Sequence, residues 1–87
     1  MLDQIADTLF PLAFEHIEKS AAKQITGSAA YALLAGVLDI APWYTPQALN
    51  RLVKRGLLAK DPKNSSSRTK TYAPTEAGWQ KWRRRVP

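Results

Sequence analysis

The sequence predicts a mostly α-helical domain with one small β-hairpin, in the order helix, helix, turn, helix, hairpin, helix. Three observations support this fold class. Apolar residues recur at helical spacing in the first half of the chain. A threonine–proline pair opens a short helix in the middle of the chain, and a glycine closes it. Two short runs of β-favouring residues then flank a polar turn. With 87 residues, the chain is expected to form a single domain over 1–87.

Two helices are predicted in the first half of the chain. Asp3 is placed to cap the first, and Pro11 inside its apolar pattern predicts either a kink or a helix that begins there. Ser28 is placed to cap the second helix. Because residues 29–38 are almost all apolar, we expect this second helix to be central and buried.

The second half of the chain carries stronger boundary signals. Thr45 and Thr75 are each placed to cap a helix, and Gly56 is a good left-handed residue to end the helix that Thr45 opens. Between Gly56 and Thr75, two strands flank a polar turn and predict a hairpin. The predicted bounds are about 45–55 for the third helix, about 57–74 for the hairpin and about 75–85 for the last helix.

Charge is distributed unevenly along the chain. Residues 1–44 carry two Lys against five Asp or Glu, a net charge of −3, whereas residues 45–87 carry eleven Lys or Arg against two acidic residues, a net charge of +9. The whole chain has a net charge of +6 and a pI of about 10.0. A polyanion is the natural partner of so basic a half. The alternative is a solvated basic surface that aids solubility.

Several classes of protein are disfavoured. The absence of cysteine excludes a disulfide scaffold and a cysteine-ligated zinc finger. The N-terminus lacks the basic start of a secretory signal, and the longest apolar run, residues 29–38, is too short to span a bilayer. We therefore expect a cytoplasmic protein with no membrane partner. A single histidine, His16, and the lack of a glycine-rich phosphate loop disfavour an enzyme, a metal site, a cofactor and a small-molecule ligand.

Two segments resemble winged helix-turn-helix regulators of the MarR and PadR families. The first is Leu49-Asn-Arg-Leu-Val-Lys-Arg-Gly-Leu-Leu58, and the second is Lys70-Thr-Tyr-Ala-Pro-Thr-Glu-Ala-Gly78. Similar prokaryotic regulators have a recognition helix that ends in Arg-Gly-Leu-Leu, then a basic wing, a tyrosine on the return strand and a Thr-x-x-Gly helix start. The resemblance covers residues 45–82 and implies a winged helix-turn-helix fold that binds DNA.

This resemblance implies roles for polar and basic residues. The N-terminal part of the third helix would enter the major groove, where Gln and Asn pair with adenine and Arg pairs with guanine. Cationic and hydroxyl side chains farther along would contact phosphates. The base-reading candidates are Thr45, Gln47, Asn50 and Arg51, and the phosphate-binding candidates are Lys54, Arg55, Lys60, Lys63, Ser65, Ser66, Arg68 and Lys70. The alternatives are a merely solvated helix face and a wing tip without a partner.

Apolar residues in excess of one helix face predict a homodimer. A single reading helix covers one half-site, so a symmetric dimer would double the readout. The expected interface residues are Leu2, Ile5, Leu9, Phe10 and Trp82. The alternative is that these residues close over a small core. The turn aromatics Trp43 and Tyr44, and Trp79 of the last helix, are expected to pack in the core. The alternative for Trp43 and Tyr44 is contact with the sugar or phosphate of DNA.

Together these features predict a sequence-specific transcriptional regulator that binds double-stranded DNA, acting as a prokaryotic or phage repressor. Two other functions fit the same sequence. One is a protein-binding winged helix that acts as an adaptor or inhibitor. The other is a plasmid or phage replication or architectural protein that binds DNA with little sequence preference.

Overall fold

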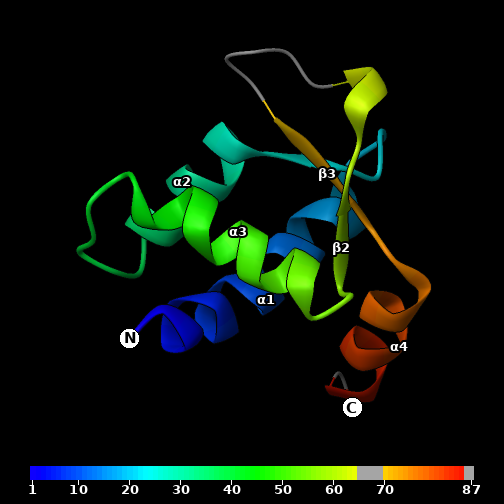
Figure 1. Cartoon of the computed structure of the whole chain (residues 1–87). Coiled ribbons are helices and arrows are strands. Elements are labelled where there is room, and N and C mark those ends of the chain that lie inside the picture. Colours follow the sequence, from blue (N-terminus) through cyan, green and yellow to red (C-terminus); the bar gives the residue numbers. More distant parts are fainter. Residues whose placement is uncertain (65–69, 86–87) are drawn as a thin grey trace.

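The computed structural model describes residues 1–64 and 70–85, and over these residues it has the predicted winged helix-turn-helix architecture (Figure 1). Helices pack around one core, and three short antiparallel strands form a sheet in the order β1-β3-β2. The elements are α1 (Leu2–Lys19), β1 (Ile25–Thr26), α2 (Gly27–Ala35), α3 (Tyr44–Lys54), β2 (Leu58–Lys60), the 3-10 helix η1 (Pro62–Asn64), β3 (Thr71–Pro74) and α4 (Glu76–Arg85).

Helix α1 is the central element, and it is continuous through its proline. It runs from Leu2 to Lys19 through Pro11, so the expectation of a start at Pro11 is wrong. One face of α1 is buried against α3, α2 and α4, and this packing outweighs the cost of one proline, about 3 kcal/mol. The expected Asp3 cap is also wrong, because Met1 is the N-cap residue and no side-chain cap bond forms.

Helix α2 is shorter and less buried than expected. Thr26 caps it by accepting a hydrogen bond from the Ala29 backbone N–H at 3.1 Å, so the assignment of the cap to Ser28 is wrong. Of its residues only Ala30 and Leu34 are fully buried, and Val37 beyond its end is 56% exposed. An apolar run this short packs through one face, and its other face stays at the surface.

The predicted hairpin is confirmed, and a third strand joins it. β2 and β3 pair antiparallel, with Ala59 opposite Ala73. β1 pairs on the other edge of β3, with Ile25 opposite Tyr72. Tyr72 is only 2% exposed, and burial raises the pKa of its hydroxyl group.

Helix α4 begins at the predicted cap and closes the core. The Thr75 Oγ1 atom accepts a hydrogen bond from the Gly78 backbone N–H at 3.0 Å. Trp79 is half-buried, with its ring 5.4 Å from the Phe14 ring in an edge-on contact. Trp82 is 9% exposed, and its indole N–H donates to Glu18 Oε2 at 3.1 Å.

The expected dimer interface is largely the core of one chain. Ile5, Leu9, Phe10 and Trp82 are all buried, and only Leu2 of the expected set stays partly exposed. The aromatic rings of Phe10, Phe14 and Trp82 lie against each other, with centroid separations from 4.7 to 6.3 Å. The apolar surplus of α1 therefore fills a small core, which corrects the assignment of these four buried residues to a dimer contact.

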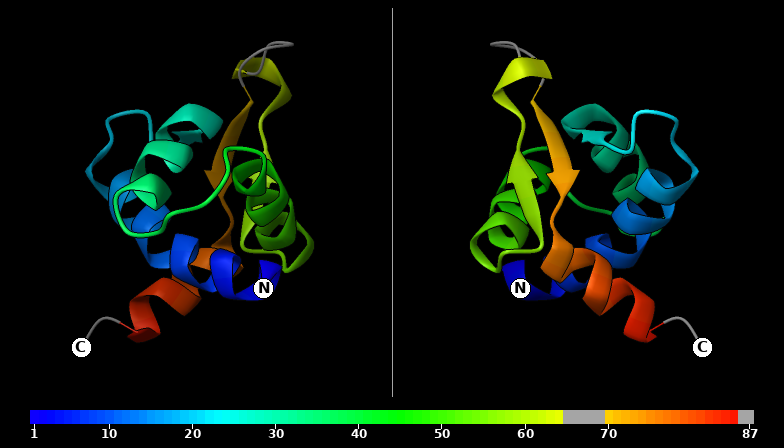
Figure 2. Two further views of the ribbon diagram at one scale, coloured as in Figure 1. Left: turned by 90° about the vertical axis from the view of Figure 1, so that its left-hand side faces the viewer. Right: turned by 90° about the vertical axis from the view of Figure 1, so that its right-hand side faces the viewer.

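The side views show which parts project from this core. η1 and the adjoining ends of β2 and β3 extend beyond the helical body, and α4 and both termini lie at the opposite end (Figure 2). α3 lies at the front of Figure 1, beside β2. The fold thus presents the third helix and the hairpin wing side by side.

Candidate nucleic-acid interface

Helix α3 is held by one apolar face and by a well-formed C-terminus. Ala48, Leu49 and Leu52 are completely buried, chiefly against α1 and secondarily against α2. After α3 ends, Gly56 adopts a left-handed φ of 77°. The Leu57 N–H then bonds to the Leu52 carbonyl and the Gly56 N–H bonds to the Val53 carbonyl, both at 3.0 Å. This pair of bonds is a Schellman motif, and it turns the chain directly from α3 into the wing.

The opposite face of α3 is polar and open to solvent. Gln47, Asn50 and Lys54 are exposed, and Arg51 is half-buried. These four residues line one shallow hollow together with Leu2 of α1. The structure therefore brings three predicted base-reading residues and one predicted phosphate-binding residue together on one surface. Their amide, guanidinium and ammonium groups are the ones that pair with base edges and phosphates.

Thr45 does not belong to this surface. It is 2% exposed, and its Oγ1 atom is buried without a hydrogen-bond partner in the described part of the chain. The predicted helix start is displaced by two residues, since Trp43 is the N-cap residue and makes no side-chain cap bond. Thr45 thus lies inside the first turn and faces the core, so its assignment to base reading is wrong.

Thr45→Val is expected to stabilise the fold. A buried hydroxyl without a partner costs roughly 1–3 kcal/mol, and valine keeps the shape of threonine without that group. We expect the free energy of unfolding, measured by urea titration, to rise by about 1 kcal/mol. Thr45→Ser retains the hydroxyl and loses the methyl group, so it should lower stability. A loss of stability in Thr45→Val would show that the hydroxyl has a partner.

Two arginines of the predicted site are held by aspartates of α1. Arg55 donates from Nη1 to Asp7 Oδ1 at 2.7 Å and from Nη2 to Asp3 Oδ1 at 3.2 Å. The Arg51 Nε atom lies 3.3 Å from the same Asp3 oxygen. The hydrogen bond with Asp7, together with the charges of Asp7 and Asp3, raises the pKa of Arg55.

These ion pairs change the role expected of Arg55. Its guanidinium already has two carboxylate partners, so a phosphate would compete with them. The charged groups remain close to solvent, because the side chains of Asp3 and Asp7 are each 66% exposed. Neither aspartate was expected at this site. Their acidic side chains stand one turn apart at the start of α1, but only the packing of α1 on α3 brings them to the arginines.

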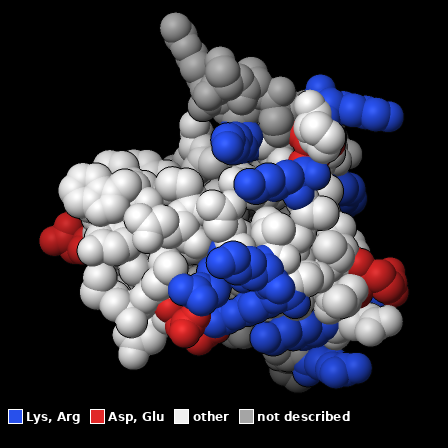
Figure 3. Space-filling model, viewed as in Figure 1, with Lys and Arg blue, Asp and Glu red and all other residues white. Residues whose placement is uncertain are grey.

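The wing contributes further cations on the same side. Lys60, Lys63 and Lys70 are exposed, and Figure 3 shows Lys and Arg side chains gathered over α3 and over the base of the wing. Asp61 accepts a hydrogen bond from the Lys63 backbone N–H at 3.0 Å and so fixes the turn that carries Lys63. The other wing candidates, Ser65, Ser66 and Arg68, lie outside the described residues.

An exposed tryptophan stands at the start of α3. Trp43 is 64% exposed, which corrects the expectation that it fills the core. Tyr44 is half-buried and packs on the core as expected, and the two rings lie 6.1 Å apart. The sequence alone carries no signal that separates these neighbouring aromatics, because the turn before them sets which ring faces inward.

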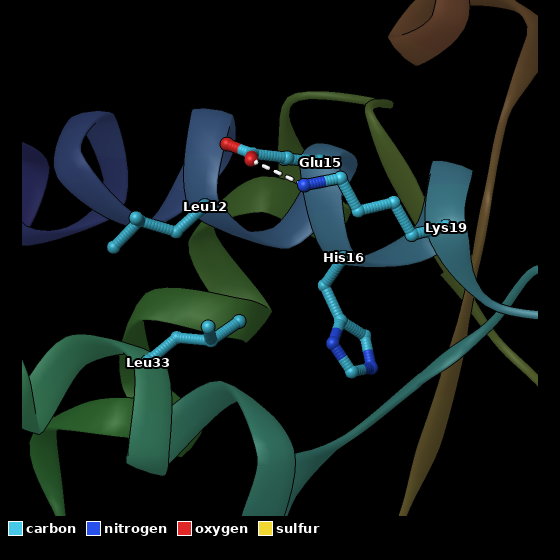
Figure 4. A pocket seen from close by; sticks show the side chains of 5 residues that line it. All are labelled: Leu12, Glu15, His16, Lys19 and Leu33. Carbon is cyan, nitrogen blue, oxygen red and sulfur yellow. Dashed lines mark hydrogen bonds and ion pairs between the residues drawn. The ribbon is translucent and has the colours of Figure 1, made fainter.

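A second hollow lies away from this face. It is lined by α1 and α2 residues, with Leu12 and Leu33 as apolar walls and His16 pointing into it (Figure 4). The adjacent Glu15 carboxylate forms an ion pair with Lys19 at 3.0 Å. The carboxylate nearest to His16 along the chain is therefore engaged with a lysine on the next turn, and the hollow shares no residue with the α3 surface.

Comparison with known proteins supports the fold. No protein-family model and no curated protein sequence matches the chain. Among solved structures, a cysteine-to-serine mutant of MarR from E. coli in complex with operator DNA matches with a TM-score of 0.57 and 19% sequence identity. The match covers 97% of this chain and 65% of the MarR chain, so this chain spans less than two-thirds of its neighbour. In the described residues, no helix is long and apolar enough to cross a bilayer.

Proposed function

We propose that this protein is a DNA-binding transcriptional regulator without catalytic activity. Helix α3 enters the major groove and reads bases with Gln47, Asn50 and Arg51. Lys54 and the wing lysines contact the phosphate backbone. Regulation is by occupation of a site, as a repressor of prokaryotic type that blocks access of other proteins to the same DNA.

One observation carries this proposal. The polar face of α3 and the basic wing lie on the same side of the molecule, with lysines on both (Figure 3). A helix with buried apolar residues on one side needs only a solvated surface on the other. Here that surface combines amides, which suit base edges, with cations, which suit phosphates. The fold shared with the MarR–operator complex supports the same docking mode.

Binding to duplex DNA and its salt dependence test the proposal. We expect the wild-type protein to bind duplex DNA, with an affinity that falls as salt rises, because each neutralised phosphate releases counterions. Lys54→Gln and Lys63→Gln should each flatten the slope of log affinity against log salt by about 0.9. Fluorescence anisotropy with a labelled duplex at several salt concentrations measures this slope.

Lys19→Gln is the matched control for these variants. Lys19 is an exposed lysine that borders the hollow between α1 and α2, away from α3 and the wing. Removing its charge should leave the slope unchanged. Absence of duplex binding at low salt would reject the proposal and favour an acidic protein partner. An equal loss in all three variants would show a diffuse charge effect instead of a docked interface.

The proposal includes a homodimer for reasons of specificity. One small module buries roughly 600–1,000 Å² on DNA, which gives limited discrimination among genomic sites. Two copies on a palindromic site would double the contacts. Because Ile5, Leu9, Phe10 and Trp82 are buried in one chain, the contact between copies would use other residues. The stoichiometry of the same DNA titration reports the number of copies bound.

A further inference from the structure

Trp43 continues the exposed face of α3 by one turn. Its backbone is helical, with φ −68° and ψ −14°, although it is the N-cap residue. Residues four apart lie on the same side of a helix, so Trp43 is in line with Gln47, which is followed by Asn50. The exposed stripe therefore begins with a large aromatic side chain that is 64% exposed and continues with amides.

The indole of Trp43 has an aromatic neighbour that is itself anchored in the core. Its ring lies 6.1 Å from the Tyr44 ring with an interplanar angle of 35°, and Tyr44 packs against the core. A side chain held by a neighbour loses less conformational entropy when it binds a partner. An exposed aromatic that adjoins a polar binding face is also a feature typical of contact sites.

The position of Trp43 limits what it can contact on DNA. In a helix-turn-helix complex, the N-terminal end of the recognition helix is the end that contacts base edges. The major groove is lined mainly by hydrogen-bond donors and acceptors, and its apolar group is the 5-methyl group of thymine. The carbon edge of the indole can pack on this methyl group. The polar edges of the other bases suit hydrogen bonds with Gln47, Asn50 and Arg51.

We propose that Trp43 packs on a thymine methyl group in the major groove and makes the protein prefer thymine at one position of its site. This inference rests on the proposed function, and it adds base reading to a residue for which the sequence favoured core packing over contact with DNA sugar or phosphate. Val37, another exposed apolar residue, lies in the preceding loop and outside the α3 stripe, so it has no such role.

Parallel selection of binding sites tests the proposal. Wild type, Trp43→Ala, Trp43→Phe and Val37→Ala are each used to select sites from a random duplex library. We expect the wild-type and Val37→Ala sites to share a thymine position that Trp43→Ala no longer prefers. Binding of the wild-type site by Trp43→Ala should weaken at least about fivefold, as for loss of one base-pair contact. Trp43→Phe keeps an apolar ring and should retain part of the preference.

Replacing that thymine by uracil isolates the methyl group. Uracil pairs as thymine does and lacks only the 5-methyl group, so wild-type affinity should fall about fourfold, the value of one buried methyl. Trp43→Ala should bind both duplexes equally. Thermal melting of each variant checks that it is folded.

The outcomes separate this proposal from the one on which it depends. If wild type binds duplex DNA and Trp43→Ala selects the same sites, the thymine contact is rejected and the proposed function stands. If Trp43→Ala keeps the site preference but changes the sedimentation mass, the indole is a protein contact, which also rejects the proposal. If wild type binds no duplex, both proposals fail.

Discussion

Gly78→Ala is expected to destabilise the protein by about 3 kcal/mol, although alanine is normally the better helix former by about 1 kcal/mol. A Cβ atom at position 78 would overlap the Leu57 carbonyl oxygen and would lie 2.6 Å from Phe14 Cζ. The Leu57 carbonyl cannot turn away, since it accepts a hydrogen bond from the Thr75 N–H at 3.2 Å. Relief of the clash therefore requires α4 to move and weakens the Thr75 cap.

The measurement is thermal unfolding followed by circular dichroism. For a domain of this size, about 3 kcal/mol lowers the midpoint by about 12 °C or more. Gly36→Ala is the matched control, because a Cβ there would meet the Leu33 carbonyl oxygen at an ordinary 3.4 Å. Its midpoint should change little or rise slightly. Equal stability of Gly78→Ala and wild type would mean that α4 does not approach Leu57 this closely.

The fold was predictable where short-range signals determine it. Thr75 caps α4, and Gly56 ends α3 with a left-handed backbone, because both effects depend on a few neighbouring residues. β1 was not predictable, since its two residues show no periodicity and become a strand only by pairing with β3. Trp82 shows the same limit, because its ring packs on Phe10 and Phe14 and its indole N–H bonds to Glu18, all more than 60 residues earlier in the sequence.

The candidate site was predictable in its residue types and not in their pairing. Helical periodicity placed Gln47, Asn50 and Arg51 on one polar face, as the structure has them. The same periodicity did not assign Thr45 to the core, because the helix start differs by two residues from the predicted one. The Asp3–Arg55 contact joins residues 52 apart in the sequence, and no local pattern predicts it.

Neutralising Asp3 and Asp7 together is expected to strengthen DNA binding about tenfold under the proposed function. In Asp3→Asn/Asp7→Asn, Arg51 and Arg55 lose their carboxylate partners, so Arg51 becomes available to bases and Arg55 to a phosphate. In water, a unit negative charge about 7 Å from a phosphate contributes about 0.6 kcal/mol of repulsion. Two such charges together approach the roughly 1.4 kcal/mol that corresponds to a tenfold change in affinity. The double variant should also steepen the salt slope, by up to about 0.9 for one added phosphate contact at Arg55.

The stability of the fold should change little in this variant. Both carboxylates are 66% exposed, and exposed ion pairs contribute about 0–1 kcal/mol each. Glu15→Gln is the control, because Glu15 is an exposed carboxylate on the same helix that borders the hollow between α1 and α2 and pairs with Lys19. If Glu15→Gln raises affinity as much as the double variant, net charge alone explains the gain.

Arg55→Ala separates two roles of the aspartates. If Asp3 and Asp7 compete with phosphate for Arg55, adding Arg55→Ala to the double variant should remove much of the gain in affinity. If they instead hold Arg55 in the orientation that meets DNA, the double variant should bind more weakly than wild type, and the expected gain would be contradicted. Competition is the expected result, because Arg55 makes both of its contacts, at 2.7 and 3.2 Å, with groups of the same charge as phosphate. A phosphate that approaches Arg55 also meets the negative charges of Asp3 and Asp7, so its binding should strengthen once these charges are removed.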